Sequence, residues 1–372
     1  MEKRNNTVFK TYLIYFIAMA FFALVRIASA MGVFNGLNPT ASSVVFTSII
    51  QIGIMFIIPF VLYMVMFKLK PKQVVVRASV KKIAPKVILL SIALGFSAFF
   101  INIIVSSIFN SVLSFMGFNF GGGGGGGTAT VGISAVILDL VLIAVLPALA
   151  EEFLHRGLLL NSTRAIGYKK AILISSFLFG LIHFNITQFS FAFVVGMLLG
   201  LVTVVSKSIW PAVIMHFINN ALSVYLAHAR ANNWFGQDFY THLNNFLRSE
   251  SAIITFITMM LFIVVLGLIT TYLVFAIFKI TTLDKVKSAA TQIASILPDK
   301  EQGLQAQNIF KEILTKNTDF NINANKNSSI LDFILPVNKN AFKPNRVDNT
   351  FLTASIILGG LATIFTFVWG IL

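Results

Sequence analysis

The sequence predicts an all-α protein: a polytopic transmembrane helical bundle of about nine spans with a small cytoplasmic insert. Of its 372 residues, 57% are hydrophobic and only 11% are charged, whereas soluble domains carry about 25% charged residues. Apolar runs of about 20 residues, the length that crosses a bilayer core, recur along the chain. The chain contains no cysteine, which excludes disulfides, thiol catalysis and thiolate metal sites.

Each apolar run is expected to form one membrane-spanning helix. The runs are 11–33, 43–67, 87–117, 131–150, 171–187, 189–206, 209–228, 252–280 and 351–371. The first run is expected to stay as an uncleaved span, because Arg26 interrupts the approach to Ala28-Ser29-Ala30, which otherwise resembles a signal-peptide cleavage site. Removal of residues 1–30 as a signal peptide is the alternative.

The basic residues predict the orientation. The net charge is +15, but Lys and Arg lie between the apolar runs, so the expected partners are membrane lipids and not nucleic acid. The loop 68–86 carries basic side chains and no acid, which places it and the N-terminus in the cytoplasm. The Asn-, Lys-, Ile- and Phe-rich composition favours a multi-pass protein of a bacterial plasma membrane.

The composition divides the chain into five segments. They are N-terminal helices with the basic loop (1–130), a transmembrane core (131–228), an outer loop and further span (229–280), a polar cytoplasmic insert (281–350) and a C-terminal helix (351–372). Gly121 to Gly127 is an unbroken glycine run, which predicts a flexible external tether.

Three polar islands interrupt the apolar runs, and the first is Glu151-Glu152 with Arg156. A charge at the centre of a membrane helix costs about 2.5–3.5 kcal/mol on insertion scales. Glu152 and Arg156 are four residues apart and share a helix face, so an ion pair would offset part of that cost. The other carboxylate is then free to hold a water as a general base. A structural ion pair at a helix end is the alternative.

The second island is Phe179-Gly180-Leu181-Ile182-His183. A single histidine in an apolar helix is more often a packing residue than a catalyst. However, if the chain turns near Gly167, Glu151 and His183 lie at similar depth, roughly 24 Å along their helices from the turn. Equal depth would let the two side chains face each other.

The third island contains His216 and Asn220, which are four residues apart and share a helix face. Counted from Lys207, His216 is only roughly 13 Å deep. That depth differs from the depth of His183 unless helices are tilted or broken. Interhelical hydrogen bonding is the alternative role for this island.

The remaining polar groups carry less weight. His228 and His242 are expected to be solvated at or in the outer loop, His155 is a weaker candidate participant, and Asp139 is a candidate buried polar contact.

Together, the three islands resemble the CPBP family, the type II CAAX-prenyl-endopeptidase and bacteriocin-processing intramembrane proteases also known as the Abi family. The family pattern is Glu-Glu-x-x-x-Arg, Phe-x-x-x-His and His-x-x-x-Asn on consecutive transmembrane helices. Here it reads Glu151, Glu152 and Arg156; Phe179 and His183; His216 and Asn220. The resemblance covers roughly 131–228, and it departs from the pattern at His155, where an aromatic residue is expected.

The resemblance implies an intramembrane endopeptidase that acts on a membrane-associated peptide or protein. Glu151 and His183 would activate a water, His216 and Asn220 would donate hydrogen bonds to the oxyanion, and Glu152 with Arg156 would orient the site. The family is often labelled metalloendopeptidase. If a zinc ion were present, Glu151, His183 and His216 would hold it, but a metal-free mechanism is favoured. In a bacterium, a signalling, leader or bacteriocin peptide is the expected substrate.

Two other functions remain open. The chain could be a non-catalytic scaffold or a bacteriocin-immunity or regulatory protein of the same family. Intramembrane Glu, Arg and His are also typical of proton-coupled transporters, although the two halves of the chain show no internal repeat.

Overall fold

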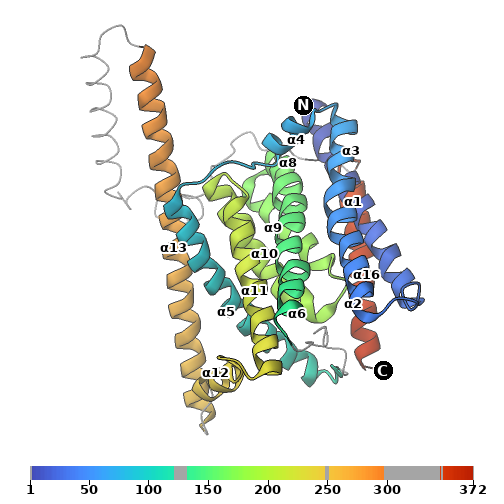
Figure 1. Ribbon diagram of the computed structural model, residues 1–372. Helices are drawn as coiled ribbons and strands as arrows, with labels where there is room; N and C mark the ends of the chain where they lie inside the picture. Colours follow the sequence, from blue (N-terminus) through green and yellow to red (C-terminus); the bar gives the residue numbers. More distant parts are fainter. Residues whose placement is uncertain (1, 121–131, 248–250, 297–343, 345–346, 372) are drawn as a thin grey trace.

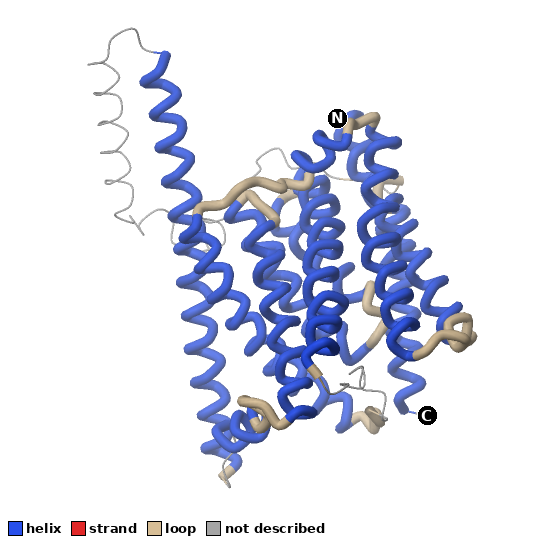
Figure 2. Tube along the Cα trace, in the orientation of Figure 1, coloured by secondary structure: helices blue, strands red, loops and turns tan. Residues whose placement is uncertain are grey.

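The computed structural model describes residues 2–120, 132–247, 251–296, 344 and 347–371, and these contain helices and no strand (Figures 1 and 2). The first half contains α1 (Glu2–Ala30), α2 (Pro39–Ser48), η1 (Ile49–Ile57), α3 (Ile58–Phe67), α4 (Pro71–Arg77) and α5 (Pro85–Phe115). The middle part of the chain contains α6 (Ile133–Asp139), η2 (Leu140–Val145), α7 (Leu146–Glu152), η3 (Phe153–Leu160), α8 (Asn161–Thr163), η4 (Arg164–Ile166), α9 (Tyr168–Leu181), α10 (Ile186–Ser206) and α11 (Trp210–Asn232). The last described helices are α12 (Phe239–Leu247), α13 (Ala252–Ile296) and α16 (Thr350–Ile371).

The predicted all-α transmembrane bundle is confirmed. Within the described residues, seven helical stretches are long and apolar enough to cross a membrane, by length and composition. They are 6–30, 39–67, 85–115, 133–166, 186–206, 253–282 and 350–371. The runs 171–187 and 209–228 are not among them: α9 has only 14 residues, and α11 carries several polar side chains. The count of nine spans stays a prediction.

The helix that carries the glutamate pair is longer than the apolar run 131–150. It continues to Ile166 through two π-helical stretches, η2 and η3, which lie on either side of α7. The sequence 153–160 is buried throughout, so the helix extends as a central element and not as a surface end. π-Helical turns are rare in proteins, and those that do occur are frequently found at functional sites.

The chain reverses at Gly167, where the prediction placed a turn. Gly167 has φ +106°, a backbone conformation that side chains rarely tolerate. Helix α9 then runs back antiparallel and ends at Leu181, earlier than the predicted end at 187. The backbone N–H of Ile186 donates to Thr366 Oγ1 at 3.0 Å, which ties the start of α10 to α16. The short connection 182–185 is therefore held in place inside the bundle.

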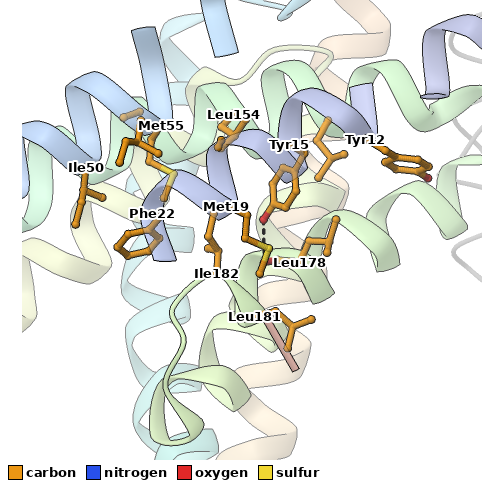
Figure 3. Close-up of a cluster of buried hydrophobic side chains, with 14 of the residues drawn as sticks. Tyr12, Tyr15, Met19, Phe22, Ile50, Met55, Leu154, Leu178, Leu181 and Ile182 are labelled. Atoms are coloured by element: carbon orange, nitrogen blue, oxygen red, sulfur yellow. Dashed lines mark hydrogen bonds between the residues drawn. The ribbon is translucent and has the colours of Figure 1, made fainter. Parts of the chain in front are cut away.

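A buried apolar cluster joins α1 to η1, η3 and α9 (Figure 3). Met19 and Tyr15 of α1 pack with Leu154 of η3 and Leu178 of α9. The Tyr15 hydroxyl donates to the Leu178 carbonyl at 3.0 Å, so the buried phenol has a partner. This cluster positions η3 and the end of α9, the two elements that carry site residues.

Helices α5 and α11 approach closely at Gly95. A Cβ on Gly95 would lie 2.5 Å from Ile218 Cβ, which is closer than any real contact. Small residues permit such close approach between membrane helices. Helix α13 packs against α5 on the outside, and α16 packs against α1. The close α5–α11 contact brings the polar side chains of these two helices together.

Some sequence predictions fall outside the described residues. These are the Gly121–Gly127 tether and most of the polar insert 281–350. The first part of the insert is helical, because α13 continues past 280 to Ile296. The five-segment division remains a prediction.

Candidate active site

Glu152 is the centre of a buried polar cluster. Its Oε1 accepts hydrogen bonds from Arg156 Nη1 and from His216 Nδ1, both at 2.8 Å. The side chains of Glu152 and Arg156 are fully buried. The predicted Glu152–Arg156 pair is therefore present, and it lies inside the protein rather than at a helix end. Through His216, this pair joins η3 and α7 to α11.

The guanidinium of Arg156 is held by two further contacts. Its Nη2 donates to the Gly196 carbonyl at 3.0 Å, and its Cζ lies 4.4 Å from the centre of the Phe179 ring. A Cβ on Gly196 would lie 3.2 Å from Arg156 Nη2 and 3.1 Å from Phe179 Cδ1. Glycine at this position therefore leaves room for the guanidinium between α9 and α10. A cation over an aromatic face gains stability when both are desolvated.

Glu151 points to a different environment from that of its neighbour. It lines a cavity of about 400 Å³, within the range of small-molecule sites. Its Oε1 accepts a hydrogen bond at 2.8 Å from Nε2 of Gln51, a residue of η1. His183 and His216 line the same cavity. The two adjacent glutamates thus separate into one inside the ion cluster and one on the cavity wall.

His183 lies in the turn after α9 and not within a helix, which corrects the sequence expectation. Its Nδ1 is 2.7 Å from the Phe179 carbonyl oxygen, and because a carbonyl can only accept, Nδ1 carries the proton. The Nε2 of a neutral His183 is then an acceptor. The ring packs edge-on against Phe179 at 5.2 Å between centroids. Glu151 and His183 thus line one cavity, as their similar depth predicted.

Three asparagines of α5 and α11 form a chain of amides that lines the same cavity. Asn102 Nδ2 donates to Asn219 Oδ1 at 3.3 Å, and Asn219 Nδ2 donates to Asn220 Oδ1 at 2.9 Å. Asn220 Nδ2 donates to the Ile143 carbonyl in η2 at 2.9 Å. An amide NH₂ has two donors, so the second N–H of Asn220 remains available on the cavity wall. The chain of bonds fixes which end of the Asn220 amide is the donor.

A smaller cavity of about 170 Å³ adjoins the first at Glu151 and His183. Its wall includes Arg26 of α1 together with apolar side chains of α1 and η1, among them Phe22 and Met55. The glutamate–histidine pair therefore lies where two cavities meet.

The remaining polar candidates, His155, His228, Asp139 and His242, lie in different environments. His155 is fully buried, with Nδ1 2.8 Å from the Glu151 carbonyl and Nε2 3.1 Å from the Tyr15 hydroxyl. Its ring lies edge-on to Phe179 at 4.9 Å, so it packs as the expected aromatic residue would and does not line either cavity.

The expectation that His228 is solvated is wrong. His228 is 1% exposed, and its Nε2 lies 2.8 Å from Asp139 Oδ2. Because α11 continues to Asn232, His228 faces α6 across a helix contact. Asp139 makes the polar contact that the sequence suggested, but its side chain is 27% exposed and not buried. His242 lies in α12 and is exposed.

The sequence predicted different depths for His216 and His183. Breaks in the helices and the different connections between them explain why the two residues nevertheless lie at one level. His216 reaches Glu152, and its ring is 5.8 Å from that of Phe179, so these groups share one level. The turn before α11 is anchored within the bundle, where Ile209 N donates to the Ser79 carbonyl at 3.2 Å. The π-helical turns of η3 also advance less per residue than α-helical turns. Counting residues from Gly167 and Lys207 therefore overestimates the difference in depth.

A zinc ion does not fit the side chains as they are arranged. Among the described residues, no group of three His, Cys, Asp or Glu is placed to hold a metal. Glu151, His183 and His216, the three residues that would hold zinc, line one cavity but do not form such a group.

Sequence reasoning missed Gln51, Asn102 and Asn219, which complete the site. Gln51 and Asn102 are polar side chains within apolar runs, and that signal could have identified them as candidates. Their partners are 100 or more residues away in the chain, so no local spacing connects them to the three islands, whereas Asn219 lies directly before Asn220 in the third island.

The comparison with protein families bears on this geometry. Residues 133–222 match the family model described as type II CAAX prenyl endopeptidase Rce1-like. The match covers 90 of 372 residues and includes the three islands, which confirms the resemblance predicted from them. None of the curated proteins or solved structures compared matches the chain.

Proposed function

Because residues 133–222 form an Rce1-like domain, we propose that this multi-pass chain is a CAAX-type intramembrane endopeptidase that hydrolyses a peptide bond with a water activated by Glu151 and His183. The observation that carries the proposal is the position of these two groups on one cavity wall, with His183 Nδ1 bound to Phe179. That bond presents Nε2 as an acceptor. A carboxylate and an imidazole acceptor at one cavity are the groups that a hydrolytic water needs.

In the first step, water lies between Glu151 and His183 Nε2. Glu151 takes one proton as the water oxygen attacks the carbonyl carbon of the scissile bond. Gln51 holds the carboxylate by its hydrogen bond, which keeps the carboxylate oriented toward the cavity. In the second step, the same proton passes to the departing amide nitrogen, the C–N bond breaks, and a carboxylic acid and an amine result.

The negative charge that develops on the carbonyl oxygen is stabilised by side chains that line the same cavity. The free N–H of Asn220 is one donor. Removing one such donor typically costs about 10²–10³-fold in kcat. Asn102 and Asn219 act as positioning residues, because they hold the Asn220 amide in its donating orientation.

His216 can serve as the second donor only when it is doubly protonated. Its Nδ1 already donates to Glu152, so a neutral ring has an acceptor, not a donor, at Nε2. In either form of the ring, the Nδ1–H bond to Glu152 ties α11 to the buried ion pair.

The proposed mechanism uses no metal. Its support is that the described residues contain no group of three His, Asp or Glu placed to hold a metal. Purified enzyme is expected to keep its rate after extensive chelation. Loss of activity on chelation, with recovery on adding zinc, would replace this mechanism with a metal-assisted one.

The test of the function compares peptide termini in membranes of cells that express either wild type or Glu151→Gln at equal level. New termini are expected with wild type only. Asp238→Asn is the matched control: it makes the same carboxylate-to-amide change in a turn outside both cavities, and its profile should equal that of wild type. Identical profiles for all three proteins would reject proteolysis and favour a non-catalytic scaffold or immunity role in the bacterial plasma membrane.

A further inference from the structure

The main cavity occupies one half of the bundle. Its walls include Thr47 and Gln51 in the first half of the α2–α3 stretch and Ile143 and Pro147 in the first half of the 133–166 helix. In α11, which runs the opposite way, the lining continues past the middle to Ser223. The cavity thus extends from Glu151, near the middle of the bundle, toward the ends where α2, α6 and α10 begin and α5 and α11 finish (Figure 1).

The other half of the bundle is closed by packed and hydrogen-bonded side chains. Tyr63 is 1% exposed, and its hydroxyl lies 2.8 Å from Thr11 Oγ1 and 2.9 Å from Ser162 Oγ. The segment after α4 seals the next gap, where Ser208 Oγ donates to the Lys81 carbonyl at 2.7 Å. The residues of η3 between Glu152 and this seal are all buried. These contacts pack the described residues at this end of the bundle against the buried side of Glu152.

The two ends of the bundle also differ in charge. The closed end carries basic side chains at three connections: within the segment 68–86, within the segment 164–170, and at Lys207. The connections at the cavity end that the structure describes contain no Lys or Arg: 31–38, 116–120, 182–185 and 233–238. Loops rich in Lys and Arg face the cytoplasm. The cavity end is then the extracytoplasmic end.

We propose that the active-site cavity opens to the extracytoplasmic face and takes a polypeptide segment presented on that side, such as an exported peptide or the outer end of a membrane-anchored one. The access route follows from the fold and the charge distribution. Only the role of the occupant as a substrate rests on the proposed function. Cleavage would occur after the segment has been translocated, and the cytoplasmic pool of the same peptide would not be cut.

The polar side chains that line the cavity suit a peptide backbone. Asn220, Asn102 and Gln51 provide donors and acceptors, and Phe191, Val195 and Leu199 provide apolar surface. No Lys or Arg lines this cavity. An extended segment with small or apolar side chains fits these walls, since its backbone amides find partners while no charged side chain is required.

The absence of cysteine permits a direct test of access. Single-cysteine variants are made in the full chain and treated with a membrane-impermeant sulfonated maleimide in sealed right-side-out and inverted vesicles. Thr47→Cys and Ser223→Cys report on the cavity. Asn35→Cys and Lys72→Cys, both at exposed positions, mark the extracytoplasmic and basic ends. Leu268→Cys, 67% exposed in the middle of α13, is the control for a thiol that faces lipid.

The cavity variants are expected to label in right-side-out vesicles together with Asn35→Cys, whereas Lys72→Cys labels in inverted vesicles only. Leu268→Cys should label in neither, because a thiol needs water to form the reactive thiolate. Labelling of Ser223→Cys and Thr47→Cys only in inverted vesicles would overturn the proposal, as would their failure to label from either side. Reversed labelling of the two end markers would overturn the extracytoplasmic assignment. None of these readouts requires catalysis, so a failure here is distinct from a failure of the protease function.

Discussion

The adjacent residues Glu151 and Glu152 are expected to respond in opposite ways to the same substitution. Glu152→Gln removes the charge that compensates Arg156, whose side chain is fully buried. Removing one partner of a buried ion pair typically costs about 3–5 kcal/mol, because the other charge is left uncompensated. The loss is large beside total unfolding free energies of about 5–15 kcal/mol. His216 Nδ1 loses the same acceptor charge, which adds to the cost.

Glu151→Gln is expected to keep the stability of wild type and to lose activity. Its amide oxygen can still accept the hydrogen bond from Gln51 Nε2, and the side chain lines a cavity rather than the ion cluster. The amide cannot take a proton from water, so cleavage stops. Replacement of a group that serves activity often leaves stability unchanged or raised.

The assay is denaturant-induced unfolding of each purified variant in detergent, followed by tryptophan fluorescence. The double variant Glu152→Gln/Arg156→Gln is the control, because it removes the uncompensated charge and should recover part of the loss. The reasoning is refuted if Glu152→Gln unfolds at the wild-type denaturant concentration, or if Glu151→Gln is destabilised equally. A double variant less stable than Glu152→Gln alone would also contradict it.

Three further changes test the site and the packing. Gln51→Leu removes the charge-assisted bond to Glu151, so the free energy of unfolding should fall by about 1.5–3 kcal/mol, and kcat should fall as well because the carboxylate is no longer held toward the cavity; an unchanged kcat would refute this role. Asn220→Ala should lower kcat by about 10²–10³-fold with little change in KM, and steady-state kinetics that show a change in KM alone would argue against an oxyanion donor. Gly95→Ala should destabilise the protein by about 1–3 kcal/mol through overpacking. Adding Ile218→Ala should restore part of this loss in the same unfolding assay.

The sequence alone determined the class of fold and the set of candidate residues. Long apolar runs identify membrane helices because each helix must bury its own backbone hydrogen bonds in lipid, and this signal is local. The pairing of Glu152 with Arg156 was also predictable, since a separation of four residues places both on one helix face. A turn near Gly167 was the condition for placing Glu151 and His183 at similar depth, and the structure contains that turn.

Only the tertiary structure decided how the two glutamates divide their roles. The two glutamates are adjacent in the sequence, so local spacing does not distinguish them. They differ in their partners: Gln51 from η1 bonds to Glu151, and His216 from α11 bonds to Glu152. The burial of His228 against Asp139 and the amide chain from Asn102 to Asn220 likewise join residues far apart in the chain. Hydrogen bonds between distant segments depend on how helices pack, and π-helical stretches change the facing of every residue that follows them. Local periodicity carries neither quantity, so the geometry of the site emerges only when the helices are assembled.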